Sequence, residues 1–197
     1  NEVIALGEEL SLKRELAIPG LVASMQDLLD SLAMKDVQFQ FKLEKLATPS
    51  VSGLNRLTLH VKFNKGSDFL PIEKAASGGE LSRIMLAFKV VLSEESDLPT
   101  IVFDEIDTGV SGEIANRVAE LLASISKKMQ VISISHVPQM ASKGQQHYKV
   151  YKETSEGITN TKITILNTDQ RLVEIAEMLS GKNPSEAAVQ NARELLN

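Results

Sequence analysis

The sequence predicts an α/β fold: a lobe built on a parallel βαβ core, with antiparallel hairpins and flanking helices. Two short runs rich in β-branched residues, at 101–103 and 131–134, have the length and composition of strands. Between them, apolar residues recur at helical spacing and share one face, namely Ile114, Val118, Leu121, Leu122 and Ile125. A helix between two strands makes them parallel, so we expect both strands to be buried.

The first residues are expected to form the end of a coiled-coil arm. Val3, Leu6, Leu10 and Ala17 recur at spacings of three, four and seven residues, although Lys13 interrupts the apolar seam. An ordinary amphipathic helix explains this stretch equally well. Pro19 is well placed as the first residue of the next helix, so we divide the chain into an arm over 1–18 and a lobe over 19–197. This abrupt start suggests a fragment of a longer protein.

Two alternating segments predict an antiparallel pair of strands. Residues 37–44 and 57–63 alternate apolar and polar side chains, and a loop containing Thr48-Pro49-Ser50 and Ser52-Gly53 is expected to join them. A helix follows the Ser77-Gly78-Gly79 turn. Its expected core face consists of Leu81, Ile84, Met85, Phe88, Val91 and Leu92.

The C-terminal part predicts a hairpin and two helices. The hairpin runs from Tyr148 to Leu166 and turns near Ser155-Glu156-Gly157. The first helix is expected to end at Gly181, a residue suited to a C-terminal cap. The second is expected to use Asn183 as its N-cap and Pro184 as its first helical residue.

Composition narrows the class of protein. The 197 residues carry 43% hydrophobic and 24% charged residues, which is ordinary for a globular protein. The absence of cysteine excludes disulfides and thiolate metal sites, and fits a cytoplasmic location. No apolar run approaches the ~20 residues that span a bilayer, so we expect no membrane partner. The net charge of −5 provides no global attraction for nucleic acid.

Ser77, Gly78 and Gly79 directly precede a helix, where free backbone N–H groups and the helix dipole favour an anion. Glycines let an oxyanion approach the backbone, and the serine adds a hydroxyl donor. The alternative is a simple cap, in which Ser77 or Ser82 caps the helix and Glu80 complements its dipole.

Asp104 and Glu105 follow an apolar strand, at the edge of an α/β sheet where ligands bind. One carboxylate suits Mg²⁺, and the next can orient and deprotonate a water. The alternative is that both acids cap the following turn. Together with the Ser-Gly-Gly turn they indicate phosphate chemistry, yet the chain has no Gly-x-x-x-x-Gly-Lys-Ser/Thr loop.

Asp107 and His136 complete the candidate residues. Asp107 either caps the helix that carries Ile114 or reaches a partner subunit, in a loop that Gly109 and Gly112 make mobile or tightly turned. His136 follows the second parallel strand, on the same sheet edge as Glu105, where it can bond a phosphate or the attacking water. A structural role for His136 is equally open. His60 and His147 are interpreted as surface residues.

The order of these motifs resembles the C-terminal lobe of an ABC-type ATPase head, a P-loop NTPase fold. The amino-acid sequences of residues 76–87, 103–112, 135–139 and 174–181 resemble those of the RecN-like, SMC-related family of bacterial DNA-repair proteins. The resemblance implies that Ser77, Gly78 and Gly79 contact a γ-phosphate held by another subunit, with Glu80 supporting that turn. It implies further roles for four residues: Asp104 near Mg²⁺, Glu105 as general base, Asp107 as a cross-subunit loop acid and His136 as the switch histidine.

The same resemblance implies a function. Two ATP molecules would bind between two heads, so the expected partners are an N-terminal Walker A lobe of the same protein, a second head and, through the full-length protein, DNA. The expected role is double-strand break repair and recombination in the cytoplasm, at the nucleoid. Because the chain lacks a Walker A loop, we expect it to be inactive alone. The alternatives are a head lobe of another SMC-like or ABC ATPase, and a non-catalytic dimerisation lobe.

Overall fold

The computed structural model describes residues 2–75, 78–94, 96, 98–104, 106–107, 109–155 and 158–197. The chain divides into two compact units, residues 1–98 and 99–197. Mixed helices and strands, with one parallel and two antiparallel sheets, confirm the predicted α/β class.

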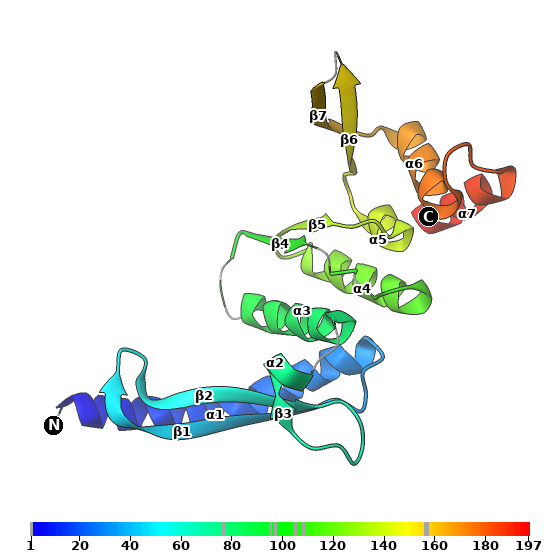
Figure 1. The fold of residues 1–197 in the computed structure, drawn as a ribbon. Coiled ribbons are helices and arrows are strands. Elements are labelled where there is room, and N and C mark those ends of the chain that lie inside the picture. Colours follow the sequence, from blue (N-terminus) through cyan, green and yellow to red (C-terminus); the bar gives the residue numbers. More distant parts are fainter. Residues whose placement is uncertain are drawn as a thin grey trace. The chain divides into compact units, whose positions relative to one another are not determined.

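The first unit consists of a long helix, a three-stranded antiparallel sheet and two further helices (Figure 1). Its elements are α1 (Glu2–Ser31), β1 (Gln38–Ser50), β2 (Gly53–Lys62), β3 (Leu70–Pro71), α2 (Ile72–Ala75) and α3 (Gly78–Glu94). The predicted pairing of β1 with β2 is confirmed, with Phe39 opposite Val61 and Phe41 opposite Leu59. The loop between these strands is much shorter than predicted. Strand β1 continues to Ser50 and β2 begins at Gly53, which leaves a two-residue turn.

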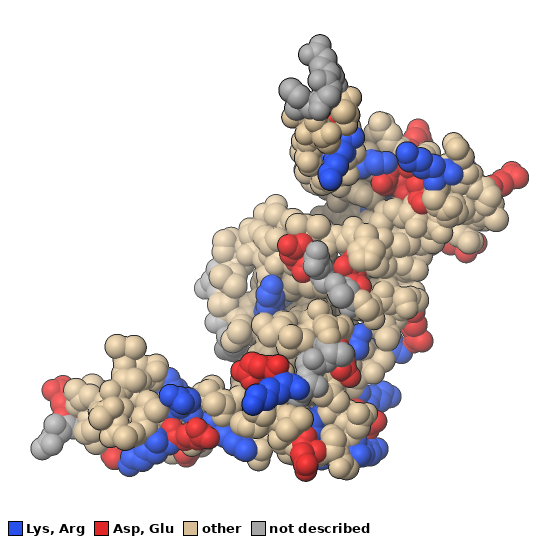
Figure 2. Space-filling view, in the orientation of Figure 1, with Lys and Arg blue, Asp and Glu red and all other residues tan. Residues whose placement is uncertain are grey.

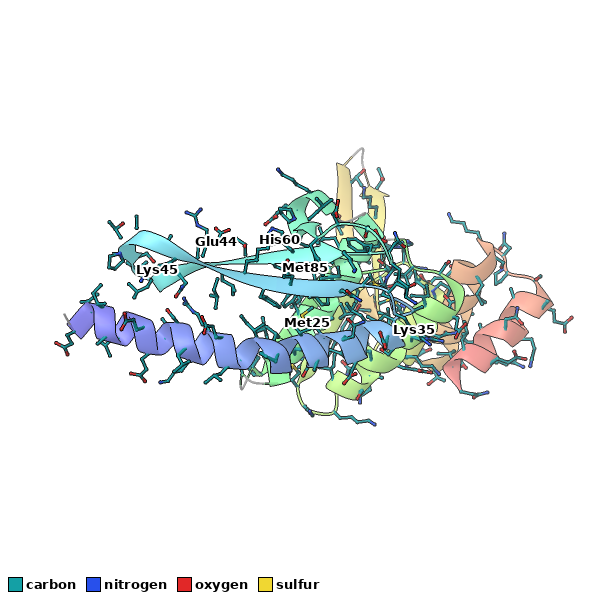
Figure 3. The ribbon with its side chains drawn as sticks, turned by 90° about the horizontal axis from the view of Figure 1, so that it is seen from below. Met25, Lys35, Glu44, Lys45, His60 and Met85 are labelled. Atoms are coloured by element: carbon teal, nitrogen blue, oxygen red, sulfur yellow. The ribbon has the colours of Figure 1, made fainter. Side chains whose placement is uncertain are left out.

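The core of the first unit lies between α1, the hairpin and α3. Phe88 of α3 packs edge-on against Phe39 and Phe41, with ring centroids 6.4 and 6.3 Å apart. Figure 3 shows α1 running alongside the β1–β2 hairpin, with Met25 fully buried on the helix. The predicted core face of α3 is partly wrong: Met85 and Leu92 are exposed, whereas Leu86, Ala87 and Val90 are buried.

Pro19 lies inside α1 rather than at the start of a helix, which corrects the prediction for this residue. Proline has no N–H, so the helix loses one i→i−4 hydrogen bond there. Contacts of α1 with β1, β2 and α3 compensate for that loss, so the helix continues. The proposed boundary between arm and lobe at residue 18 therefore coincides with no break in secondary structure and stays a prediction.

The second unit contains the parallel βαβ core, a hairpin and a helical pair. Its elements are β4 (Thr100–Asp104), α4 (Gly112–Ile125), β5 (Gln130–Ile134), α5 (Pro138–Lys143), β6 (Tyr148–Ser155), β7 (Ile158–Ile165), α6 (Thr168–Ser180) and α7 (Glu186–Leu196). The parallel pairing of β4 with β5 and the antiparallel pairing of β6 with β7 are both confirmed. The predicted turn residues Glu156 and Gly157 lie outside the described residues.

The ends of the last two helices follow from local capping. Gly181 caps α6 with a φ of 85°, as predicted, and its N–H bonds the carbonyl of Glu177. The N-cap of α7 is Ser185, whose hydroxyl accepts from the N–H of Ala188, and not Asn183. Asn183 instead has a φ of 60°, and this left-handed backbone belongs to the turn that precedes the helix.

The strands of the βαβ core are less buried than predicted. Phe103 is fully buried, but Val102, Ile132 and Ile134 are 49%, 45% and 55% exposed. Parallel strands normally have both faces covered. In this chain one face of the two-stranded sheet is exposed to solvent.

One face of the molecule carries charged side chains of both signs. On the face drawn in Figure 2, Lys and Arg atoms are interspersed with Asp and Glu atoms. This agrees with the modest net charge of −5.

Among the described residues, no helix is long and apolar enough to cross a membrane.

Candidate functional site

Asp107 is the centre of a hydrogen-bonded cluster at the carboxyl end of the parallel sheet. Its side chain is 1% exposed, and its Oδ2 accepts from the Ser135 hydroxyl at 2.6 Å and from the backbone N–H of His136 at 2.8 Å. The Nδ1 atom of His136 lies 3.1 Å from the same oxygen. The structure thus brings Asp107 and His136 together, as the parallel order of β4 and β5 requires.

The backbone of the 106–112 loop explains how an acid becomes buried so close to a sheet edge. The Val110 N–H bonds the Asp107 carbonyl at 3.0 Å, and Ile106 and Val110 are both buried. Gly109 and Gly112 have φ values of 70° and 54°, which glycine adopts without steric cost. The loop is therefore tightly turned, and its apolar side chains hold Asp107 inward.

Asp107 does not cap the following helix, which corrects one of its two predicted roles. The N-cap of α4 is Ser111, with an extended backbone. Because Asp107 lies several residues before that helix and bonds the segment after β5, it is committed to a different element. Its role as a cross-subunit acid stays a prediction.

His136 combines a fixed backbone with an accessible ring. Its side chain is 82% exposed, while its main chain is held by Asp107. Ser135 extends the cluster, because its hydroxyl also accepts from the N–H of Val137 at 3.0 Å. Val137 is the N-cap of α5, so one chain of hydrogen bonds connects the loop after β4 to the start of the next helix.

Asp104 lies at the end of β4, on the exposed face of the parallel sheet. It stands opposite Ile134, and Val102 stands opposite Ile132, so these four side chains share that face. Asp104 is itself exposed. Glu105, the predicted general base, lies outside the described residues. The face therefore offers one carboxylate within an apolar surround.

The Ser-Gly-Gly turn belongs to the first unit. Ser77 lies outside the described residues, whereas Gly78, Gly79 and Glu80 form the first turn of α3. The sequence allowed Ser82 to cap the start of α3. In the structure its hydroxyl instead donates to the Gly78 carbonyl at 2.9 Å. A Cβ at Gly78 would meet no atom within 4 Å, so packing in this chain does not require a glycine there.

A metal ion would depend on few groups of this chain. Among the described residues, no three His, Asp or Glu side chains are grouped to hold one. Mg²⁺ is commonly bound through one or two carboxylates together with substrate phosphates and water. The exposed carboxylate of Asp104 fits that partial role.

A second polar cluster supports α5, which directly follows His136. Arg171 of α6 donates to the carbonyl of Ser142 at 2.6 Å and to that of Gly144, at the end of α5. Lys149 bonds Glu174 and lies 3.5 Å from Glu177. Burial lowers the pKa of the Arg171 guanidinium, and the Glu174 carboxylate raises the pKa of Lys149.

His147 belongs to this cluster and is half-buried, so its interpretation as a surface residue is wrong. Burial, with the positive charge of Arg171 as a smaller cause, lowers the pKa of His147. His60 is also half-buried. Both have an Nδ1 atom that is buried without a hydrogen-bond partner in the described structure. His60 lies in β2 and His147 directly precedes β6, and the local polar sequence does not reveal that either is partly covered.

Sequence reasoning missed two residues of these clusters, Ser135 and Arg171. Ser135 immediately precedes the candidate histidine, at the end of an apolar strand, and that adjacency was the available signal. Arg171 gives no such signal, because its carbonyl partners lie at the end of α5, 27 or more residues away.

The fold defines the class of structure: a lobe with the fold of an SMC head. The structure resembles the solved Smc head domain with coiled coil and joint from Pyrococcus yayanosii, with a TM-score of 0.63 and 21% identity, over 86% of this chain and 30% of that one. A structure from work on ATP-driven dimerisation of SMC ATPases matches with a TM-score of 0.56 and 22% identity, over 81% of this chain and 91% of that one. At these identities the likeness concerns the fold.

The sequence comparisons identify the family. The model of the RecF/RecN/SMC N-terminal domain matches residues 4–159, and the chain belongs to this family. It is 42% identical to the DNA repair protein RecN of Deinococcus radiodurans over 195 residues, which are 99% of this chain and 34% of that protein. It is 36% identical to RecN of Haemophilus influenzae over 197 residues, 100% of this chain and 35% of that protein. The chain thus spans about a third of the length of these relatives.

Proposed function

We propose that this chain is the C-terminal head lobe of a RecN-like ATPase that acts in DNA double-strand break repair and recombination. The observation that carries this proposal is the exposed face of the parallel sheet, where Asp104 lies among Val102, Ile132 and Ile134. A face of this composition requires a covering lobe. A lobe that carries a Walker A loop would place a nucleotide beside the acid.

The proposed ATP site is assembled from two heads. The N-terminal lobe of the same protein would hold ATP over Asp104 and Glu105, and the Ser77–Gly79 turn of a second head would contact the γ-phosphate. The open space at Gly78 supports this contact. Packing within the described structure does not explain a glycine at this position, whereas close approach of a phosphate to the backbone would. The N-terminal end of a helix such as α3 suits an anion, because the helix dipole is positive there.

The proposed reaction is attack of water on the γ-phosphorus. Glu105 accepts a proton from the water, whose oxygen bonds phosphorus as the bond to the β,γ-bridging oxygen breaks, releasing ADP and phosphate. Asp104 would hold Mg²⁺, which when bound neutralises charge on the phosphates. His136 would bond the γ-phosphate or the water. ATP would favour the closed dimer because that state supplies contacts from both heads.

The relatives support the biological setting. Proteins named DNA repair protein RecN match nearly the whole chain, which supports DNA as a partner of the full-length protein and a cytoplasmic, nucleoid-associated location. The mixed charge on the face drawn in Figure 2 does not itself mark a DNA site.

The test is reconstitution of the head. The chain alone should show no ATPase activity above background, and co-expression with the N-terminal lobe should produce it. In the reconstituted head, Glu105→Gln should abolish turnover while prolonging the ATP-bound dimer, and Glu120→Gln, which removes an exposed acid of α4, should not. Turnover by the chain alone, or unchanged turnover in Glu105→Gln, would contradict the proposal. ATP-dependent dimers without any hydrolysis would favour the dimerisation lobe instead.

A further inference from the structure

The carboxylate of Asp107 makes its contacts with Ser135 and His136. Its carboxylate is 1% exposed, and one oxygen, Oδ2, receives all three of its contacts with Ser135 and His136. Two of these three contacts come from a single residue, through its backbone N–H and its ring Nδ1. The same oxygen therefore holds the main chain of His136 by a hydrogen bond and lies 3.1 Å from its ring.

The chemistry of the pair determines where the imidazole carries its proton. An ionised carboxylate has only acceptors, so a ring nitrogen 3.1 Å from it is favoured as the N–H side of the ring. In a neutral imidazole the other nitrogen, Nε2, is then unprotonated and can accept a hydrogen bond. The ring is 82% exposed, so Nε2 is open to a ligand.

The location of Asp107 makes a purely architectural explanation costly. A buried carboxylate loses its hydration, and this loss must be offset by hydrogen bonds or an opposite charge. The Oδ1 atom of Asp107 is buried and has no hydrogen-bond partner among the described residues. Among the described residues, the basic side chain at ion-pair distance from Asp107 is that of His136. A neutral side chain would fill this site at lower cost if only the loop had to be held.

We propose that Asp107 is a positioning residue that holds His136 in the Nδ1–H tautomer and leaves Nε2 to contact the nucleotide or the attacking water. This inference rests on the proposed function, because it concerns how the histidine of that ATP site is oriented. It differs from the role as a cross-subunit acid that the sequence predicts for Asp107. The tautomer itself can be measured without any nucleotide.

The first test is the tautomer of His136 in the full-length protein. With ¹⁵N-labelled histidine at a pH of about 8, where an ordinary histidine is neutral, the shifts of the two ring nitrogens report which one is protonated. The His136 signal is assigned by its loss in His136→Gln. The Nδ1–H form is expected, and the Nε2–H form in the wild-type protein would overturn the inference, even if no variant folded.

The second test uses variants of the carboxylate. Asp107→Ala should remove the preference for Nδ1–H, whereas Asp107→Asn should keep it, because an amide oxygen can still accept from the ring. Ser135→Ala disturbs the same loop but leaves the carboxylate, and should also keep it. An unchanged tautomer in Asp107→Ala would overturn the inference.

The third test is the kinetics of the same variants in full-length ATPase. Asp107→Ala should lower kcat by about 10- to 100-fold, the range for residues that orient a functional group. It should leave the KM for ATP unchanged, and Asp107→Asn should recover part of the loss. The matched control Asp169→Ala, in the first turn of α6, should retain wild-type turnover. A tautomer that changes without any change in kcat would overturn the inference.

These readouts separate this inference from the proposed function. If His136→Gln retains full turnover, the role of His136 in the proposed ATP site fails, whatever the tautomer is. If His136→Gln is inactive but Asp107→Ala is not, the positioning role fails and the proposed function stands.

Discussion

Asp104 lies directly opposite Ile134 in the parallel ladder of β4 and β5, so the candidate metal-binding carboxylate shares a face with exposed apolar side chains. An isolated acid at a strand end would be unremarkable. Its combination with Val102 and Ile132, each about half exposed, fits the proposed function, in which another lobe covers this face. The same contact would then build both the interface and the nucleotide site.

Ile132→Thr tests this face. In the chain alone the side chain is 45% exposed, so the free energy of unfolding should change by only about 0.5 kcal/mol. Association with the N-terminal lobe should weaken about tenfold or more, because about 1–3 kcal/mol of apolar burial is lost. Titration calorimetry or co-purification measures the association. Val173→Thr, equally exposed on α6, is the matched control, and equal effects of both variants would contradict a specific interface.

Ser77→Arg tests the contact between heads. A long cation in the Ser-Gly-Gly turn should block ATP-dependent pairing of reconstituted heads, because it occupies the space that a γ-phosphate requires. Pairing is measured by light scattering, and circular dichroism checks that the lobe remains folded. Ser67→Arg, in an exposed loop of the same unit, should leave pairing unchanged. Normal dimers of Ser77→Arg would rule out the proposed contact.

Local sequence was sufficient for most elements of the fold. Alternation identified β1 and β2, and β-branched runs around an amphipathic segment identified the parallel pair. Two errors concern positions where longer-range packing decides. Pro19 continues α1 because the helix packs against the hairpin and α3. One face of β4 and β5 is exposed although their β-branched composition is typical of a buried sheet.

The site was predictable in its members but not in its internal bonds. The shared sheet edge of Asp107 and His136 follows from the parallel order of the strands. That Asp107 turns inward to Ser135 and His136 depends on a contact across 28 and 29 residues. Local patterns carry no information about such a contact, and they equally suggested a helix cap.

Arg171 should contribute to the stability of the second unit. Arg171→Met keeps much of the apolar stem but removes the donors to the carbonyls of Ser142 and Gly144. Leaving these acceptors unpaired should cost about 1–3 kcal/mol in free energy of unfolding. Urea denaturation followed by circular dichroism measures the loss. Arg56→Met, at an exposed position of β2, should cost far less, and equal losses would contradict the capping role.

Stability should depend on pH through His147. Burial, then Arg171, lowers its pKa in the folded state from the ordinary value of 6.5, with Lys149 adding and Glu174 opposing. The unfolded chain therefore binds a proton more readily, so this contribution is complete above pH 6.5 and is lost as the pH falls toward the lower folded pKa. His147→Gln should flatten the pH dependence of the urea midpoint below pH 6.5. An unchanged profile for His147→Gln would contradict the assignment.

Two glycines of α1 offer a matched pair that tests how the helix packs on the hairpin. A Cβ at Gly7 would lie 2.5 Å from Cγ of Leu54, a buried side chain of β2, whereas a Cβ at Gly20 would meet no atom within 4 Å. Alanine favours a helix by about 1 kcal/mol over glycine, so Gly20→Ala should raise the free energy of unfolding by about that amount. Gly7→Ala gains the same helical preference but must displace Leu54, at a typical overpacking cost of about 1–3 kcal/mol, so the net effect should be destabilising. Urea midpoints of the two variants should move in opposite directions. A shift of both toward higher stability would show that α1 does not pack closely on β2 at Gly7.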